Sequence, residues 1–346
     1  MSEDGLNYRS AGVNLTEARR SLDSITESIR STYTPAVVGD VGSFGGMISG
    51  VFPALEDPVL VSSIDGVGTK TAVASKAGMY RGLGRDIVCH CVDDILVQGA
   101  KPLFFMDYFG TAKLSADILA DIVDGAAEAC RENGCALLGG ETAEMPGVYT
   151  EGEFDVVGAI TGVVDRQKIL PSPNVGHGDL IVGLASDGLH TNGFALARAA
   201  LFDRGGRRYD EQLPDLGRSL AEELLRPHRP YLSSIYPLLE EGGLVRAIAH
   251  ITGGGLYENL PRALGSSFGA VIERRSWTPN PIFGIIQEAG GIEDEEMFHV
   301  FNMGIGMALI CPSEAAGAVV QRLNDANETA FIIGEVTRGP NEVALV

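Results

Sequence analysis

The chain has 346 residues, of which 45% are hydrophobic and 21% are charged, and its formal net charge is −20. This length suits two domains with separate cores, and the acidic balance argues against nucleic acid as a principal partner. No apolar run reaches the roughly 18 residues of a membrane span, and the polar start MSEDGLNYRS lacks a secretory pattern, so we expect neither membrane insertion nor secretion.

Apolar spacing predicts helices and strands along the first half of the chain. An amphipathic helix over residues 17–33 precedes the glycine-rich segment Gly39–Gly50, which contains Gly45 and Gly46. From Val59 onward the predicted elements are a strand at 59–64, helices at 69–78 and 85–100, a strand at 102–110, a helix at 117–134, and strands at 135–140 and 155–165.

The hexapeptide DGVGTK at Asp65–Lys70 lies where a strand pattern changes to a helical one. Gly66 and Gly68 let the backbone approach an anion, and helix-start N–H groups from Thr69 onward point toward it. Lys70 adds positive charge near such an anion, and Asp65 can hold Mg²⁺. The alternative is a glycine turn with a surface lysine, since neither a Walker loop nor a dinucleotide fingerprint is present.

In segment 85–100 the apolar residues keep helical spacing and leave four polar residues toward the opposite face: Asp86, His90, Asp93 and Asp94. Two adjacent acids near a histidine offer ligands for a Mg²⁺ site begun by Asp65. A solvated acidic face is the commoner outcome of such a pattern. The tripeptide Cys89-His90-Cys91 does not predict zinc, because helix neighbours diverge by about 100°.

The glycine-rich segment GGETAEMPG follows the predicted strand CALL. Gly139 and Gly140 predict a loop, and Glu141 and Glu144 are placed there to reach a metal-bound nucleotide. A surface turn closed by Met-Pro-Gly explains the same residues equally well. A natural domain break follows at Asp165–Asp179, where prolines, glycines and charges interrupt the apolar pattern, so we expect domains at 1–168 and 169–346.

The second half repeats the order of strands and helices, in segments 179–186, 190–202, 269–276, 281–290, 300–312, 315–325 and 330–337. The fold class that we predict is α/β, with mixed α+β layers and helices on one face of each sheet. Parallel and antiparallel pairing remain open. The five cysteines, an odd number set in apolar patterns, predict reduced thiols and a cytoplasmic protein.

Two strand-to-helix turns of the second half carry candidate chemistry. In SDGLHTNGF, which starts at Ser186, Thr191 and Asn192 are cap candidates, and His190 is placed either to donate a proton to a substrate oxygen or only to help cap the helix. In TGGG, Thr252–Gly255, three glycines before a helix suit a terminal phosphate, the alternative being a flexible loop. His250 is expected in the preceding strand, and Trp277 is expected to pack in the core.

Five segments together resemble the phosphoribosylformylglycinamidine cyclo-ligase family, the aminoimidazole ribonucleotide synthetases. The resemblance runs in order from about Tyr8 to the C-terminus. Its motifs are DGVGTK (Asp65–Lys70), CVDDILVQGAKPLFFMDYFGT (Cys91–Thr111), GCALLGGETAEMPGVY (Gly134–Tyr149), SDGLHTNGFAL (Ser186–Leu196) and HITGGGLYENLPRAL (His250–Leu264).

This resemblance implies a two-domain protomer of the aminoimidazole ribonucleotide synthetase superfamily, in a homodimer whose N-terminal sheets join into a barrel. The implied reaction converts formylglycinamidine ribonucleotide and ATP to aminoimidazole ribonucleotide, ADP and phosphate in de novo purine synthesis. ATP would phosphorylate the formamide oxygen, after which the amidine nitrogen attacks that carbon and phosphate leaves.

The resemblance also implies roles for residues of this sequence. Asp65, Lys70 and His190 would take part in catalysis, and Asp65, Asp94 and Glu141 would hold Mg²⁺ and the ATP phosphates. The other expected nucleotide contacts are Gly45, Gly46, Gly66, Gly68, Thr69, Gly139 and Gly140. The expected contacts to the ribonucleotide are Ser186, His190, Thr191, Asn192, Thr252, Gly253, Gly254 and Gly255.

Two positions depart from the family pattern. Asp93 stands where members usually have asparagine, which leaves its role open, and the basic run before Pro35 is reduced to Arg30. Related kinases and synthetases are the nearest alternatives: thiamine-monophosphate kinase, selenophosphate synthetase and the preceding purine synthetase. The absence of a cysteine before Cys89 disfavours the selenium enzyme, and the length disfavours the large amidotransferase. A non-catalytic nucleotide-binding regulator is an alternative of a different class.

Overall fold

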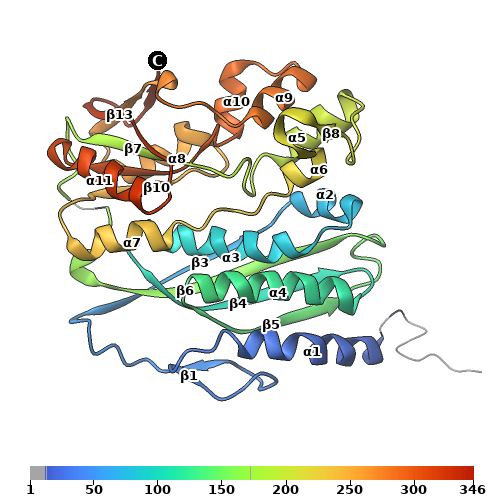
Figure 1. The fold of residues 1–346 in the computed structure, drawn as a ribbon. Helices are drawn as coiled ribbons and strands as arrows, with labels where there is room; N and C mark the ends of the chain where they lie inside the picture. Colours follow the sequence, from blue (N-terminus) through green and yellow to red (C-terminus); the bar gives the residue numbers. More distant parts are fainter. Residues whose placement is uncertain (1–11, 13, 172) are drawn as a thin grey trace, which may run out of the picture.

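The computed structural model describes residues 12, 14–171 and 173–346, which form two stacked layers of sheet and helix (Figure 1). The polar stretch 1–10, on which the expectation of no secretory signal rests, lies outside the described residues. Within the described part of the chain, no helix combines the length and the apolar character that crossing a membrane requires.

The first half builds a four-stranded sheet in the order β3-β6-β4-β5. Its β3–β6 and β6–β4 pairs are antiparallel, whereas β4 and β5 are parallel because a helix, α4, connects them. The elements are α1 (Leu15–Arg30), β1 (Val37–Val38), β2 (Met47–Ile48), β3 (Pro58–Gly66), α2 (Lys70–Ala77), α3 (Arg81–Leu96), β4 (Lys101–Thr111), α4 (Ala116–Glu132), β5 (Ala136–Glu144), β6 (Phe154–Asp165) and the 3₁₀ turn η1 (Arg166–Lys168).

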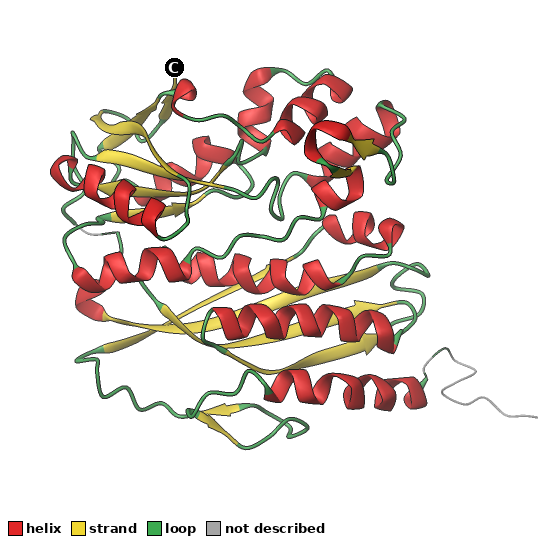
Figure 2. Ribbon diagram, in the orientation of Figure 1, coloured by secondary structure: helices red, strands yellow, loops and turns green. Residues whose placement is uncertain are grey.

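The helices of this half cover one face of the sheet, as the sequence predicts (Figure 2). Strand β3 alternates exposed and half-buried residues, so that every second side chain faces α3. The opposite face carries exposed apolar side chains, among them Leu60, Ile64 and Met106. An apolar sheet face of this kind is typical of a surface that another protein covers.

The second half builds a six-stranded sheet in the order β10-β12-β7-β13-β11-β14, in which only the β11–β14 pair is parallel. Its strands are β7 (Leu180–Ala185), β10 (Ala247–His250), β11 (Phe268–Ile272), β12 (Ile305–Cys311), β13 (Ala330–Arg338) and β14 (Val343–Leu345), and a small hairpin joins β8 (Gln212–Leu213) to β9 (Arg218–Ser219). Its helices and helical turns are α5 (Phe194–Arg198), η2 (Ala199–Arg204), η3 (Pro214–Leu216), α6 (Leu220–Leu224), α7 (Leu232–Glu241), α8 (Gly255–Ala263), η4 (Arg274–Ser276), α9 (Pro281–Gly290), α10 (Asp294–Val300) and α11 (Ser313–Asp325).

Two predicted elements differ from the structure. Strand β5 continues past Gly140 to Glu144, into the segment that was predicted as a loop, because its backbone pairs with β4 along this length. The helix predicted to start with Thr191 and Asn192 as cap candidates begins only at Phe194, with Gly193 at its N-cap, and continues as the π-helical turn η2. His190 and Gly193 have φ angles of 60° and 79°, which a right-handed helix does not accommodate.

Helix α3 lies between the two sheets, beside α7 (Figure 1). The expectation that its polar face is solvated is therefore wrong. Asp86 and Asp93 are 0% exposed and His90 is 3% exposed, because the second half of the chain packs over this face. The same packing brings polar residues from both halves together.

Candidate functional site

Two carboxylates and a histidine, contributed by one strand and one helix, lie within contact distance of each other. Asp65 comes from the end of β3, and His90 and Asp94 lie one turn apart on α3. His90 Nε2 lies 2.8 Å from Asp65 Oδ2 and 3.9 Å from Asp94 Oδ2. The side chains of Asp65 and Asp94 are 43% and 26% exposed, so both carboxylates remain accessible to a ligand.

The surroundings keep both carboxylates ionised. Burial by itself would raise the pKa of Asp65, but the hydrogen bond and charge of His90 outweigh it, so the pKa lies below its usual value. Asp94 also has a lowered pKa, because contacts from His250 and from the Ser63 hydroxyl, 3.0 Å away, outweigh its burial. A pair of ionised, partly exposed carboxylates supplies the hard oxygen ligands that Mg²⁺ prefers.

Besides the direct contacts through His90 Nε2, a second series of contacts connects Asp65 to Asp94, through three histidines and a threonine. His90 Nδ1 lies 2.7 Å from Thr191 Oγ1, which is 3.5 Å from His228 Nδ1. His228 Nε2 lies 3.2 Å from His250 Nε2, and His250 Nδ1 lies 2.8 Å from Asp94 Oδ1. His228 could not be predicted as a site residue, because its sequence neighbours form no motif. Only the packing of α3 against the second half reveals it.

The two strand-to-helix turns of the second half adjoin this cluster and each other. A Cβ atom on Gly253 would lie 3.4 Å from Asn192 Oδ1, although the two residues are far apart in sequence. Gly254, with φ 92°, precedes helix α8. Buried Asn259 fixes the turn by donating from Nδ2 to the carbonyls of Gly253 and Gly255, at 3.0 and 2.9 Å. Asn259 is a second site residue that the sequence analysis missed.

His190 and Ser186 do not face open space. His190 is 1% exposed, stacks on His228 with ring centroids 4.1 Å apart, and accepts the N–H of Asp187 at Nε2. Burial lowers its pKa well below the usual value, so it is a neutral ring. Ser186 donates its hydroxyl to the carbonyl of Gly188. The expectation that these side chains contact substrate directly is therefore corrected for this conformation, since both already have intramolecular roles.

Lys70 also differs from its expected role. Its side chain is 0% exposed, and Nζ donates to Asp86 and to the carbonyls of His190 and Arg226. The expectation of an ammonium beside the nucleotide is corrected, because all three donors are used inside the protein. The turn before it remains open. Gly68 and Thr69 are exposed, and Gly66 is partly exposed at the end of β3.

Glu141 and the glycine pairs form a separate group. Glu141 and Gly140 lie on β5, whereas Asp65 lies on β3, with β6 and β4 between them. Asp65 pairs with Gly158 of β6, Gly158 pairs with Asp107 of β4, and Asp107 pairs with Gly140 of β5. Three strand spacings of about 4.8 Å therefore separate Asp65 from Gly140, which is roughly 14 Å. Glu141 therefore cannot bind the same ion as Asp65 and Asp94 of one chain, which corrects the predicted ligand set.

These residues instead line a pocket of about 330 Å³ between α1, the glycine-rich segment and β5. The predicted residues on its wall are Gly45, Gly46, Gly139, Gly140 and Glu141. Arg30 ties α1 to this segment through an ion pair with Asp40. Four of the glycines that were expected near the nucleotide thus lie together, apart from the Asp65 and Asp94 carboxylates, whereas Gly66 and Gly68 adjoin Asp65.

Asp93 faces away from the carboxylate pair. It is 0% exposed, accepts the N–H of Tyr231 at 3.3 Å, and lies 3.4 Å from His228 Nε2. Burial raises its pKa well above the usual value. Its contacts with Tyr231 and His228 keep it outside the Asp65 and Asp94 pair.

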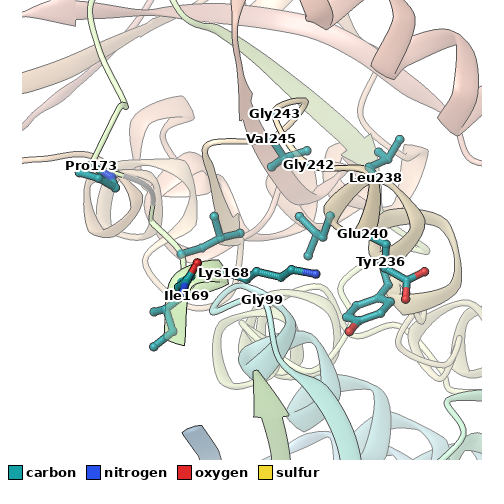
Figure 3. A pocket seen from close by; sticks show the side chains of 13 residues that line it. Gly99, Lys168, Ile169, Pro173, Tyr236, Leu238, Glu240, Gly242, Gly243 and Val245 are labelled. Atoms are coloured by element: carbon teal, nitrogen blue, oxygen red, sulfur yellow. The ribbon is translucent and has the colours of Figure 1, made fainter. Parts of the chain in front are cut away.

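A further pocket of about 220 Å³ lies between Lys168, Tyr236 and Glu240 (Figure 3). Gly99 and the turn at Gly242 complete its wall. It contains none of the residues that the sequence predicts for nucleotide or substrate. The pocket lies where the two halves of the chain join, and we assign it no role.

Two family models match most of the chain. The N-terminal domain of the AIR synthase related proteins matches residues 46–164, and the C-terminal domain of the same family matches residues 176–346. Curated relatives extend this similarity over almost the full length. The phosphoribosylformylglycinamidine cyclo-ligase of Citrifermentans bemidjiense is 47% identical, covering 98% of this chain and 97% of its own. That of Alkaliphilus metalliredigens is 44% identical, covering 100% and 99%.

Solved structures share the fold at lower sequence identity. A thiamine-monophosphate kinase from Stenotrophomonas maltophilia aligns with a TM-score of 0.70 at 18% identity, covering 93% of this chain and 95% of its own. A hydrogenase maturation protein HypE, solved in complex with ATP, aligns with a TM-score of 0.64 at 18% identity, covering 95% and 90%. At this identity the two structures bear on the fold alone.

Proposed function

Since the chain belongs to the phosphoribosylformylglycinamidine cyclo-ligase family of AIR synthase related proteins, we infer how its site carries out the family reaction. The enzyme is a ligase of purine biosynthesis that makes aminoimidazole ribonucleotide from formylglycinamidine ribonucleotide with ATP. We propose that the γ-phosphoryl group passes to the formamide oxygen. The amidine nitrogen then attacks the activated carbon, and phosphate leaves as the ring closes.

The observation that carries this proposal is the meeting of Asp65 and Asp94 at His90. Both carboxylates are ionised and partly exposed, so they fit Mg²⁺, and the remaining coordination positions are open to water and phosphate oxygens. Bound there, Mg²⁺ would neutralise charge that develops on the transferring phosphoryl group. His90 and His250 hold the two carboxylates in fixed orientations through their own hydrogen bonds.

The ribonucleotide is proposed to bind at the adjoining turns of the second half. Exposed Gly253 and the helix-start N–H groups after Gly254 suit its phosphate, with Thr252 at the edge of the same turn. Thr191 and Asn192 connect this turn to His90. These contacts support a phosphate nest and a metal-binding carboxylate pair in one continuous region, as transfer between two bound substrates requires.

The glycine-lined pocket remains a proposed nucleotide-contacting surface. Exposed backbone at Gly139, Gly140 and the Gly45–Gly46 pair suits close approach of a nucleotide. Glu141 stays part of this surface in our proposal, without sharing the ion of Asp65 and Asp94.

We propose domains at 1–168 and 169–346 and a homodimer in which the N-terminal sheets close into a barrel. The exposed apolar face with Leu60, Ile64 and Met106, and the unpaired edges of β3 and β5, support such closure. We also propose a cytoplasmic location, which suits five cysteines that are all free and buried.

The assignment is tested by ADP release with formylglycinamidine ribonucleotide as substrate. We expect Mg²⁺-dependent ADP formation that requires the ribonucleotide, and no turnover with thiamine monophosphate. Turnover with thiamine monophosphate alone would assign the site to the kinase branch of the superfamily. ATP binding in a calorimeter without turnover of either substrate would favour a nucleotide-binding regulator.

A further inference from the structure

Three buried imidazole rings form a nearly equilateral triangle where the two halves of the chain meet. His90 comes from α3 of the first half, His228 precedes α7, and His250 ends β10. The ring centroids are 5.3 Å apart for His90 and His228, 5.0 Å for His90 and His250, and 5.2 Å for His228 and His250. All three side chains are buried. The ligase reaction as described assigns no role to His228.

These spacings match those of three imidazoles on one four-coordinate ion. With metal–nitrogen bonds of about 2.05 Å and tetrahedral angles, neighbouring nitrogens lie about 3.3 Å apart and ring centroids about 5.2 Å apart. The Nε2 atoms of His228 and His250 are 3.2 Å apart. One ring nitrogen of His90 lies within 4.8 Å of a nitrogen of each other ring, so His90 moves toward the other two rings by up to about 1.5 Å when the ion binds.

The second nitrogen of every ring already has an oxygen partner. His250 Nδ1 faces Asp94 Oδ1 at 2.8 Å, and the Nδ1 atoms of His90 and His228 both face Thr191 Oγ1, at 2.7 and 3.5 Å. A hydroxyl oxygen has two acceptor lone pairs, so Thr191 can accept from both rings. At His228 and His250 such partners favour the Nδ1–H tautomer and leave Nε2 as the metal ligand. His90 Nε2 faces Asp65 Oδ2 at 2.8 Å, so this ring gives up the Nε2 proton when it binds the ion.

Access from solvent also suits an ion. With three imidazole ligands, the fourth coordination position is open to water, as in other three-histidine sites, and Asp65 stays with the Mg²⁺ site. Because Asp65 and Asp94 are partly exposed, an ion has a path from solvent to the rings.

We propose that His90, His228 and His250 form a binding site for a divalent transition-metal ion of the zinc type, distinct from the oxygen-ligand site for Mg²⁺. Imidazole nitrogen favours Zn²⁺ or Co²⁺, whereas Mg²⁺ prefers carboxylate and water. The bound ion joins α3 of the first half to two segments of the second. It therefore stabilises the contact between the halves.

The test is calorimetric titration of the full chain, without a histidine tag, with ZnCl₂. We expect one Zn²⁺ per chain with a dissociation constant below about 1 μM, unchanged by a roughly thousand-fold excess of Mg²⁺. CoCl₂ should give the intense visible bands of four-coordinate Co²⁺. Displacement by Mg²⁺, weaker binding than this, or a six-coordinate Co²⁺ spectrum would each overturn the site.

Variants locate the ion on these rings. His228→Asn should weaken Zn²⁺ binding at least about 100-fold, whereas His299→Asn, at a histidine outside the triangle, should leave it unchanged. Thr191→Val should weaken it about 10-fold or more, and Thr191→Ser should restore it, because serine keeps the shared acceptor oxygen. Equal Zn²⁺ affinity in the His228→Asn and His299→Asn variants refutes the proposal. If His228→Asn does not fold, the comparison of Thr191→Val with Thr191→Ser decides whether the ion binds at these rings.

Discussion

Replacing Lys70 by methionine should destabilise the protein instead of weakening ATP binding. The buried Lys70 ammonium donates to Asp86 at 2.9 Å, to the His190 carbonyl at 2.9 Å and to the Arg226 carbonyl at 2.8 Å. Methionine keeps the length and apolar stem of the side chain, so mainly these polar contacts are lost. Two of the three partners belong to the second half of the chain, and Lys70 therefore ties the halves together.

The size of the effect follows from what remains buried. Removing one partner of a buried ion pair costs about 3–5 kcal/mol, because the other charge stays without compensation. Asp86 keeps one hydrogen bond, from the N–H of His228 at 2.7 Å, so we expect about 4 kcal/mol. The double variant Lys70→Met with Asp86→Asn should recover at least about half of this loss, because no unpaired charge is left.

Urea unfolding measures this loss of stability. The only tryptophan, Trp277, is buried and donates from Nε1 to the Met303 carbonyl, so its fluorescence reports unfolding. With a slope of about 3 kcal/mol/M, the midpoint should fall by about 1–1.5 M. Lys76→Met, at an exposed lysine on the same helix, should change stability by less than about 0.5 kcal/mol. An unchanged midpoint in Lys70→Met together with a raised KM for ATP would refute the structural role and restore Lys70 to the nucleotide site.

Three further outcomes are expected. Asp94→Asn should lower kcat/KM about 100-fold or more with the circular dichroism spectrum unchanged, and near-normal activity at saturating Mg²⁺ would remove Asp94 from the metal site. Asp93→Asn should cost less than about 10-fold, because that side chain contacts Tyr231 and His228 and not the carboxylate pair. A Cβ atom in Gly254→Val would lie 2.6 Å from Glu258 Oε2, so the turn must shift. The KM for the ribonucleotide should rise about 10-fold or more, while the KM for ATP should stay within about 2-fold. Equal changes of the two KM values would argue against a phosphate nest at this turn. Light scattering at micromolar concentration should give a dimer that Leu60→Lys converts to monomer, and a monomeric parent protein would exclude the shared barrel.

Local patterns were enough to predict most helices and strands of the first half, and the motifs were enough to indicate the family. Periodicity placed α1, α3, α4 and the strands β3 and β6 close to their observed positions, because helices and half-buried strands repeat apolar residues locally. The DGVGTK turn lies between a strand and a helix as predicted, with Asp65 in β3 and Lys70 opening α2. His250 ends β10, and Trp277 is buried, both as expected.

What each polar side chain faces depends on how segments that are distant in the sequence pack together. Local spacing showed that Asp86, His90 and Asp93 share one side of α3, but a sequence cannot tell whether water or another layer of protein covers that side. The same limit applies to Lys70, whose partners lie more than a hundred residues away or on another helix. Strand order separated Glu141 from Asp65, since neighbours in a sheet are set by pairing between distant segments. The histidine triangle has the same origin: three residues from different elements become one site only when the two halves pack together.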